Sequence, residues 1–383
     1  MSRDIKTSLS PSTTERHIIK FQRLLYIPLV IIIPTGIYTT YQLSLYYDKR
    51  QSYLPRSTNN AHYPNIHDLY YVALFTILYI LVRLLVVPLL FKPLGNYILP
   101  AIQQKHGKWT QQIRSDKIDR FSQCSFKLLH FISIVIFGYH TLNNTSYLPS
   151  VLGGHGTVQK CFDAQYPYHS ASNELRYYVL LQFSYHLHSM IMHTFSQRRN
   201  DYIEMMVHHS AAVFLVLFGW LHHLVRIAML VAFTHDIADI FAYAVKCSVD
   251  TVHTKLTFAI YCGLMATWGY TRLYVYPVHL ISAVITEPQK VFPPDEYCSV
   301  CWNVFIFMLC TLQLLHIYWY SLFIVMGKRF IKDGATVDIQ QKVGELDDDT
   351  IYTNGSIKQN NRNKMLYTNG LTNGLNKNCS KIE

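Results

Sequence analysis

Two apolar segments of the chain carry ionisable side chains that could do acid–base chemistry. His208 and His209 are adjacent in the first segment, and His235, Asp236 and Asp239 lie close together in the second. A neutral imidazole can accept a proton from an amine or hydroxyl, or can itself be acylated. A neighbouring carboxylate fixes the tautomer of the imidazole and stabilises the imidazolium that forms. These five side chains are therefore the candidate catalytic residues.

The depth of these residues within apolar helices also indicates a function. A charged residue at the centre of a membrane helix costs about 2.5–3.5 kcal/mol on insertion scales, so it usually faces a protein interior or an aqueous cavity. At about 1.5 Å per helical residue, His208 lies about 15 Å from the Arg198–Arg199 pair and His235 about 17 Å from Lys246. Two consecutive antiparallel helices would bring the five groups to one level. The pattern favours a catalytic or ligand-binding site over isolated packing residues.

The spacing of the histidines does not match known metal sites of membrane enzymes. Di-iron desaturases use repeated histidine boxes, and the pairs His208–His209 and His222–His223 lack the upstream histidine that completes one. The zinc pattern His-Glu-x-x-His is absent from the sequence. Cys298 and Cys301 have motif spacing without a second pair, so packing or a disulfide is the preferred interpretation. We expect no metal and no cofactor, and we expect His222 and His223 to be solvated at a turn.

The composition predicts an all-α, polytopic membrane protein. The chain has 383 residues, of which 50% are hydrophobic and only 15% charged, whereas soluble domains carry about 25% charged residues. A span needs about 20 predominantly apolar residues. About eight transmembrane helices are expected, and the third of them is short. They lie near residues 24–45, 69–91, 126–139, 177–195, 203–221, 225–245, 256–276 and 300–326.

Lys and Arg residues fall mainly on one side of this arrangement. With a cytoplasmic N-terminus, the inside segments hold 18 basic residues and the outside segments 5, as the positive-inside rule requires. Both termini are therefore expected in the cytoplasm, and topology rather than nucleic acid binding explains the net charge of +11. Topology also explains most of the basic residues at the cytoplasmic ends of the spans. Among them, Arg198, Arg199 and Lys246 are candidates to bind the phosphates of a soluble donor. The sequons at Asn143 and Asn144 are expected on the opposite side, and their glycosylation stays open.

Several stretches resemble the ceramide synthases, membrane enzymes that contain the TLC (TRAM–Lag–CLN) domain. Residues 198–209, followed by Thr234-His-Asp-Ile-Ala-Asp239, resemble the longevity-assurance motif of that family. The double histidine together with His-Asp-x-x-Asp is specific to the enzymes rather than to TLC proteins in general. Further resemblance covers the entry to the TLC domain at 117–127, the lumenal loop at 153–156 and the last two spans at 271–277 and 311–319.

The resemblance implies an acyl-CoA-dependent sphingosine N-acyltransferase of the endoplasmic reticulum. Such an enzyme transfers a fatty acyl group to the amine of sphinganine or phytosphingosine and yields (dihydro)ceramide. Six TLC spans are expected to form a helical barrel around a lipid cavity. By position, His208 and His209 would be the acyl acceptor and the base, with His208 the preferred acceptor. His235 and Asp236 would orient and deprotonate, and Asp239 would complete the cluster.

The expected partners are the two substrates and the lipid bilayer, and both a homodimer and a heterodimer stay open. The chain is expected to divide into a cytoplasmic segment (1–23), two N-terminal spans with a loop (24–116), a TLC catalytic domain (117–331) and a disordered cytoplasmic tail (332–383). The family motif usually has Lys at the position of Asn200, so this chain has one basic charge fewer at the cytoplasmic end of the site. Two alternatives remain: a non-catalytic TLC protein that binds or senses lipid, and a metal-dependent lipid hydroxylase.

Overall fold

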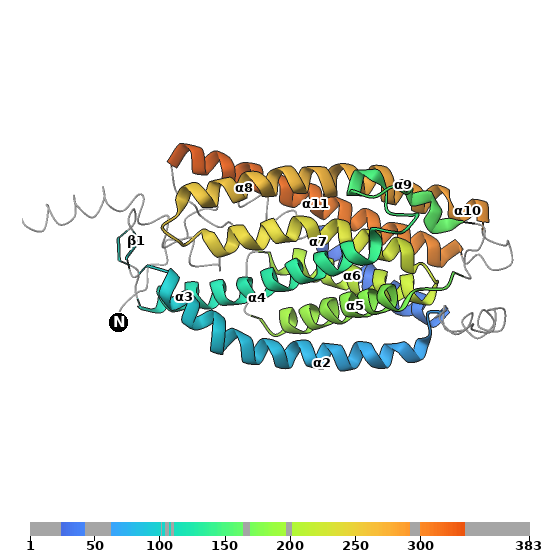
Figure 1. Cartoon of the computed structure of the whole chain (residues 1–383), viewed down its shortest axis with the longest axis horizontal. Helices are drawn as coiled ribbons and strands as arrows, with labels where there is room; N and C mark the ends of the chain where they lie inside the picture. Colours follow the sequence, from blue (N-terminus) through green and yellow to red (C-terminus); the bar gives the residue numbers. More distant parts are fainter. Residues whose placement is uncertain are drawn as a thin grey trace, which may run out of the picture.

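The structure is a computed structural model that describes residues 24–42, 63–100, 102–103, 107–108, 111–163, 169–196, 201–291 and 299–333. Long helices, arranged side by side, form most of this part (Figure 1). In chain order they are the helix Leu24–Gln42, α2 (Leu69–Val86), α3 (Lys92–Ile98), α4 (Gln111–Leu142), α5 (Asn173–Thr194), α6 (Tyr202–Leu221), α7 (Val225–Ser248), α8 (Thr254–Trp268), α9 (Ser282–Thr286), α10 (Pro288–Val291) and α11 (Ser299–Asp333).

Shorter elements join these helices. The π-helical turn η2 (Val87–Phe91) links α2 to α3, and the longer π-helical stretch η5 (Gly269–Ile281) continues α8 into α9. The 3-10 turns are η1 (Ile66–Asp68), η3 (Ser150–Leu152) and η4 (Val158–Phe162). Strand β1 (Ile102–Gln103) pairs antiparallel with β2 (Gly107–Lys108). We call the two ends of the bundle the α3 end and the α10 end, after the helices that lie there in Figure 1.

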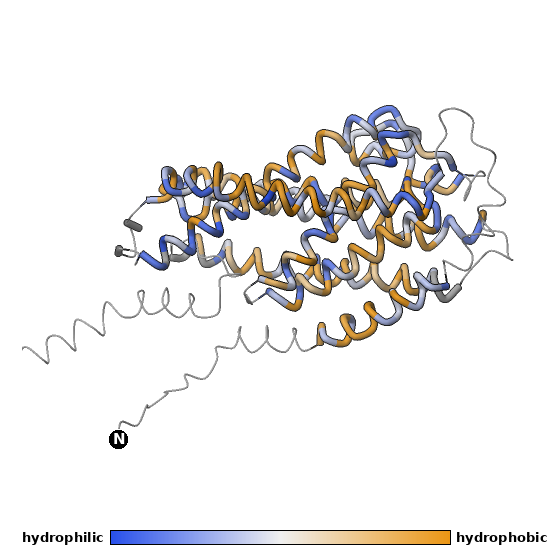
Figure 2. The backbone as a smooth tube through the Cα atoms, turned by 90° about the horizontal axis from the view of Figure 1, so that it is seen from below, coloured by the Kyte–Doolittle hydropathy of each residue, from blue (hydrophilic) through white to orange (hydrophobic). Residues whose placement is uncertain are grey.

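Helix α7 occupies the middle of the bundle and packs against α4, α5, α6, α8 and η5. Helix α2 lies at the edge against α5, and its outer face exposes Leu74, Leu78 and Leu85. Apolar residues dominate the helical stretches in Figure 2, whereas hydrophilic ones gather toward the two ends of the bundle. This distribution is the one a bilayer demands, because lipid-facing surfaces must be apolar and helices satisfy their own backbone hydrogen bonds.

Each of the eight segments expected to span is helical over the residues that the structure describes, apart from one turn residue at the end of 177–195. Six helices in the described part are long and apolar enough to cross a membrane, namely Leu24–Gln42, Ile66–Ile98, Arg114–Leu142, Tyr202–Leu221, Val225–Ser248 and Trp302–Lys328. The protein is therefore a multi-pass membrane protein. The helix α5 and the α8–η5 helix do not reach that apolarity. In α5, three histidines, His186, His188 and His193, lower the mean hydropathy.

The third span is longer than the sequence indicated. The expected segment 126–139 is the apolar half of α4, which begins at Gln111 and runs for 32 residues. Its first half is polar because Lys117 and Arg120 reach the buried carboxylate of Asp250, in the turn between α7 and α8. Burial by itself would raise the pKa of Asp250, but the two cations outweigh it and hold the pKa below its usual range.

The α10 end is closed by the segment between α4 and α5. Gly153 has a left-handed backbone, with φ of 84°, and a Cβ at Gly156 would collide with the carbonyl of Ser146. These geometric demands explain why glycine occupies positions 153 and 156. Asp163 of this segment pairs with His169 and also with Arg226 at the start of α7, at 3.2 Å. The loop is thereby attached to the helix that carries the candidate site.

Candidate active site

Helices α6 and α7 follow one another through a three-residue turn and run antiparallel. This geometry brings His208 and His209 of α6 to the same region as His235, Asp236 and Asp239 of α7. His209, His235 and Asp236 are buried. His208 packs against Trp319 and His235 against His316, and both partners belong to α11, so the two helices place their histidines against one neighbouring helix.

The two histidines of α6 face different neighbours. The ring centroid of His208 lies 5.5 Å from that of Trp319 on α11, in an edge-to-face arrangement. The ring of His209 lies 5.6 Å from His193 of α5. Within the described part of the chain, Nδ1 of His208 and Nδ1 of His209 have no hydrogen-bond partner. An unbonded ring nitrogen can accept a proton or form a covalent bond to a substrate.

The backbone sets the tautomer of His235. Its Nδ1 lies 2.6 Å from the carbonyl oxygen of Val231, and a carbonyl can only accept, so Nδ1 donates. In the neutral ring Nε2 then carries a lone pair, and it has no hydrogen-bond partner among the described residues. His235 is therefore arranged to act as a base through Nε2.

Asp236 lies on a different side of α7. Its carboxylate accepts hydrogen bonds from the amide of Gln182 and from the hydroxyl of Tyr178, the latter at 3.3 Å, and both donors belong to α5. The sequence suggested that Asp236 orients the neighbouring imidazole. In the structure that part is taken by the carbonyl of Val231, because consecutive helical residues point about 100° apart.

Asp239 forms an ion pair inside the bundle. Its Oδ1 lies 2.7 Å from Nη2 of Arg272 on η5, and this arginine is only 2% exposed. The same Nη2 donates to the carbonyl of His235 at 3.0 Å. The guanidinium also stacks over the ring of Trp268, with its carbon 3.9 Å from the ring centroid. Arg272 thus joins Asp239 to the backbone of His235.

Helix α11 connects the two halves of the site. His316 lies 4.8 Å from His235, between ring centroids, and Trp319 lies against His208. His316 is fully buried, and neither of its ring nitrogens has a hydrogen-bond partner in the described part. Sequence reasoning did not single out these two residues as part of the site. Their spacing of three on an apolar helix, which places them on one face, was the available signal.

Basic residues approach the site from the α3 end. Lys246, predicted to bind substrate, has its ammonium 5.3 Å from the ring centroid of Tyr243. Lys127 of α4 lies over the same ring at 5.3 Å. Arg198 and Arg199, the other two residues predicted to bind substrate, lie outside the described residues.

Other residues noted in the sequence fall elsewhere. His222 and His223 are buried at 4% exposure each rather than solvated, and the start of α7, directly after this turn, packs against η4 of the loop at the α10 end. Cys298 lies outside the described residues, so packing and a disulfide both stay open for the Cys298–Cys301 pair. In the part of the chain that the structure describes, no group of three His, Cys, Asp or Glu side chains has the arrangement of a metal site.

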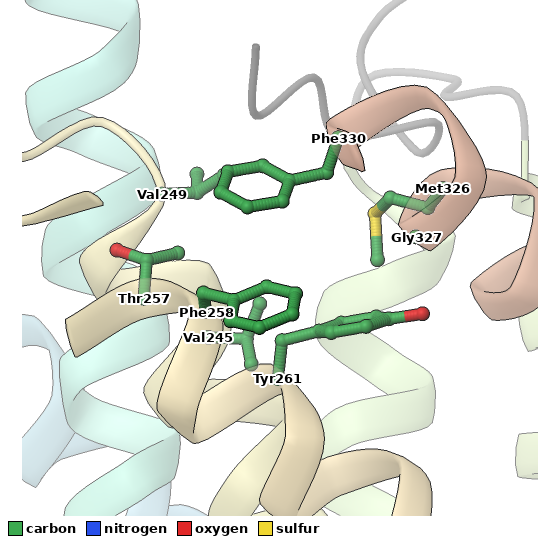
Figure 3. A pocket seen from close by; sticks show the side chains of 8 residues that line it. All are labelled: Val245, Val249, Thr257, Phe258, Tyr261, Met326, Gly327 and Phe330. Atoms are coloured by element: carbon green, nitrogen blue, oxygen red, sulfur yellow. The ribbon is translucent and has the colours of Figure 1, made fainter. Parts of the chain in front are cut away.

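A small apolar pocket lies at the α3 end, away from the histidines. Its volume is about 30 Å³, and Figure 3 shows its lining by side chains of α7, α8 and α11. Val245, one of these, lies ten residues from His235, or about 15 Å along α7. The candidate catalytic residues do not line it. The lining residues are Val245, Val249, Thr257, Phe258, Tyr261, Met326, Gly327 and Phe330.

Comparison with known proteins identifies the class. Residues 120–325 match the family model of the TLC domain, which covers more than half of the chain. The chain therefore belongs to the TLC domain family of membrane proteins. Within that family, the proteins it is similar to include ceramide synthases.

Three relatives illustrate the extent of the similarity. Ceramide synthase hyl-1 of Caenorhabditis elegans is 25% identical over 57% of this chain and 59% of its own length. Ceramide synthase hyl-2 of the same organism is 24% identical over 79% and 90%, respectively. Ceramide synthase 4 of Bos taurus is 27% identical over 60% and 55%. The chain thus spans little more than half the length of two of these relatives and most of the third.

Proposed function

We propose that the protein is an acyl-CoA-dependent N-acyltransferase that converts a sphingoid base to (dihydro)ceramide. One observation carries the proposal: His208 of α6 and His235 of α7 both pack against α11, and each keeps a ring nitrogen without a hydrogen-bond partner among the described residues. Relatives named ceramide synthase support the substrate class. The thioester is already activated, so the transfer needs neither ATP nor a cofactor.

The reaction would pass through an acylated histidine. A ring nitrogen of His208 attacks the thioester carbonyl, and coenzyme A leaves. The amine of the sphingoid base then attacks the acyl-imidazole, and His235 accepts the amine proton at Nε2. Arg272, paired with Asp239, would fix the position of His235 through a hydrogen bond to its backbone carbonyl. Gln182 and Tyr178 would fix the Asp236 carboxylate by donating hydrogen bonds to it.

We further propose that the protein lies in the membrane of the endoplasmic reticulum in one defined orientation. The α3 end would face the cytoplasm, where acyl-CoA is available, because the basic residues of the sequence concentrate there. Asn143 and Asn144 lie just after α4 at the α10 end, which would face the lumen. A glycosidase-sensitive shift in gel mobility that Asn143→Gln and Asn144→Gln together remove would support this orientation.

The central test is turnover in membranes from cells without their own ceramide synthase. Membranes with the wild-type chain should form dihydroceramide from acyl-CoA and sphinganine, and His208→Ala and His235→Ala should not. His140→Ala is the matched control, since His140 is an exposed histidine at the far end of α4. Wild-type membranes that bind sphinganine without turnover would instead favour a lipid-binding protein. Turnover retained in both site variants would contradict the mechanism.

A further inference from the structure

Lys127 lies within the span of α4, where a cation is costly. Its ammonium stands 5.3 Å from the ring centroid of Tyr243 on α7 and donates a hydrogen bond to the Tyr243 hydroxyl at 3.4 Å. The ammonium of Lys246 approaches the same ring, also at 5.3 Å. Two cations on separate helices therefore meet at one aromatic side chain.

The charge of Lys127 reaches the candidate catalytic residues. It interacts electrostatically with both His208 and His209 of α6 and with Asp239 of α7. The Asp239 carboxylate pairs with Arg272 at 2.7 Å and also interacts with the charges of Lys127 and Lys246. A site with several cations near the reacting groups is suited to an anion that develops during the reaction.

The position of Lys127 along the bundle indicates which developing anion it would stabilise. Along α7 the order from the α3 end is Lys246, Tyr243, Asp239 and His235, and Tyr243 lies about 12 Å from His235. Lys127, bound to Tyr243, is thus on the α3 side of the histidines. A donor that enters from that end, with its acyl chain beyond the histidines, would present its sulfur on the Lys127 side.

We propose that Lys127 stabilises the coenzyme A thiolate that departs when His208 is acylated, an assignment that rests on the proposed function. The lone pair of the His208 nitrogen forms the C–N bond, the C–S bond breaks, and its electron pair stays on sulfur beside the Lys127 ammonium. The acyl-imidazolium then gives its N–H proton to the thiolate. A neutral acyl-imidazole and a neutral thiol result, and the later attack by the amine forms no thiolate.

The test compares two acyl donors that differ in their leaving group. One is palmitoyl-CoA, and the other is the palmitoyl thioester of thionitrobenzoate, an aromatic thiol that leaves readily without stabilisation by a cation. The wild type is compared with Lys127→Met, Lys127→Arg and the control Lys92→Met, whose lysine is exposed on α3. The readouts are the rate of ceramide formation and, without sphingoid base, the rate of acylation of the protein by intact mass.

Removal of one group that stabilises a developing anion typically lowers a rate by about 10²–10³-fold. We expect a loss of that size for Lys127→Met with palmitoyl-CoA in both readouts, and a loss of less than about tenfold with the aromatic thioester. Lys127→Arg should recover part of the rate, and Lys92→Met should match the wild type. Equal losses with both donors would overturn the assignment and leave Lys127 as a packing residue, as would no loss at all. Wild-type membranes inactive with both donors would overturn the proposed function and this assignment together.

Discussion

Two groups of polar side chains contact α7, one at its α3 end and one at its centre. At the α3 end, Asp250 just after α7 is buried and paired with Lys117 and Arg120 of α4. At the centre, His208, His235 and His316 keep ring nitrogens without hydrogen-bond partners in the described part. Buried polar atoms are almost always bonded in folded proteins, so each exception calls for an explanation. The difference suggests that the first group holds helices together, whereas the second is kept open for a substrate.

The largest effect should follow from removal of the open imidazole of His208. We expect His208→Ala to lower ceramide formation by roughly 10³-fold or more, because it removes the group that is acylated. The melting temperature in detergent should change little, since the Nδ1 of His208 bonds no described residue. A large drop in melting temperature would show that His208 belongs with the structural group, and the comparison would fail.

The ion-paired group should respond in the opposite way. Asp250→Asn leaves two cations against a neutral amide, and breaking a buried ion pair costs about 3–5 kcal/mol of unfolding free energy. Lys92 and Asp119 form an exposed pair at 2.8 Å, so Asp119→Asn is the matched control, with an expected cost of about 0–1 kcal/mol. Thermal unfolding in detergent measures both. Equal stability of the two variants would refute the assignment of Asp250 to helix attachment.

Gln182 and Tyr178 offer a finer test at the centre, because Asp236 accepts hydrogen bonds from both. A hydrogen bond to a charged group contributes about 1.5–3 kcal/mol. Gln182→Ala should therefore reduce turnover about tenfold or more, if Asp236 acts in the site. Tyr178→Phe should reduce it less, because its bond to Asp236 is long at 3.3 Å. Steady-state rates with acyl-CoA and sphinganine measure the order, and a larger effect of Tyr178→Phe would contradict it.

The sequence predicted the helices and the approximate level of the site better than the direction of its side chains. Apolar length placed eight helical segments, and depth counting brought His208 near His235. Counting could not reveal that His235 and Asp236 point to different helices, because the rotation of α7 depends on packing with α5, η5 and α11. The ion pairs of Asp250 could not be predicted either, because its partners Lys117 and Arg120 lie about 130 residues away in the chain. In the sequence, these two basic residues indicate only the membrane topology.

The smallest effect concerns the dependence of stability on pH. The pKa of Asp250 is held low in the folded protein by Arg120 and Lys117, against the opposing effect of burial. The unfolded chain therefore binds the proton more readily. The stability from this pair is fully present above the unfolded pKa of about 3.9 and is lost as pH falls through the lower folded value.

Melting temperatures of the wild type and Asp250→Asn, measured in detergent from pH 7 to the acid limit of the detergent, isolate this contribution. The variant lacks the carboxylate but keeps every other acidic group, so the difference between the two curves belongs to Asp250. It should be constant at neutral pH and should shrink only in the acid range, because the protonated Asp250 and the amide of Asn are then both neutral. A difference that grows as pH falls would mean that burial outweighs the two cations, and the group at the α3 end would no longer count as a satisfied ion pair.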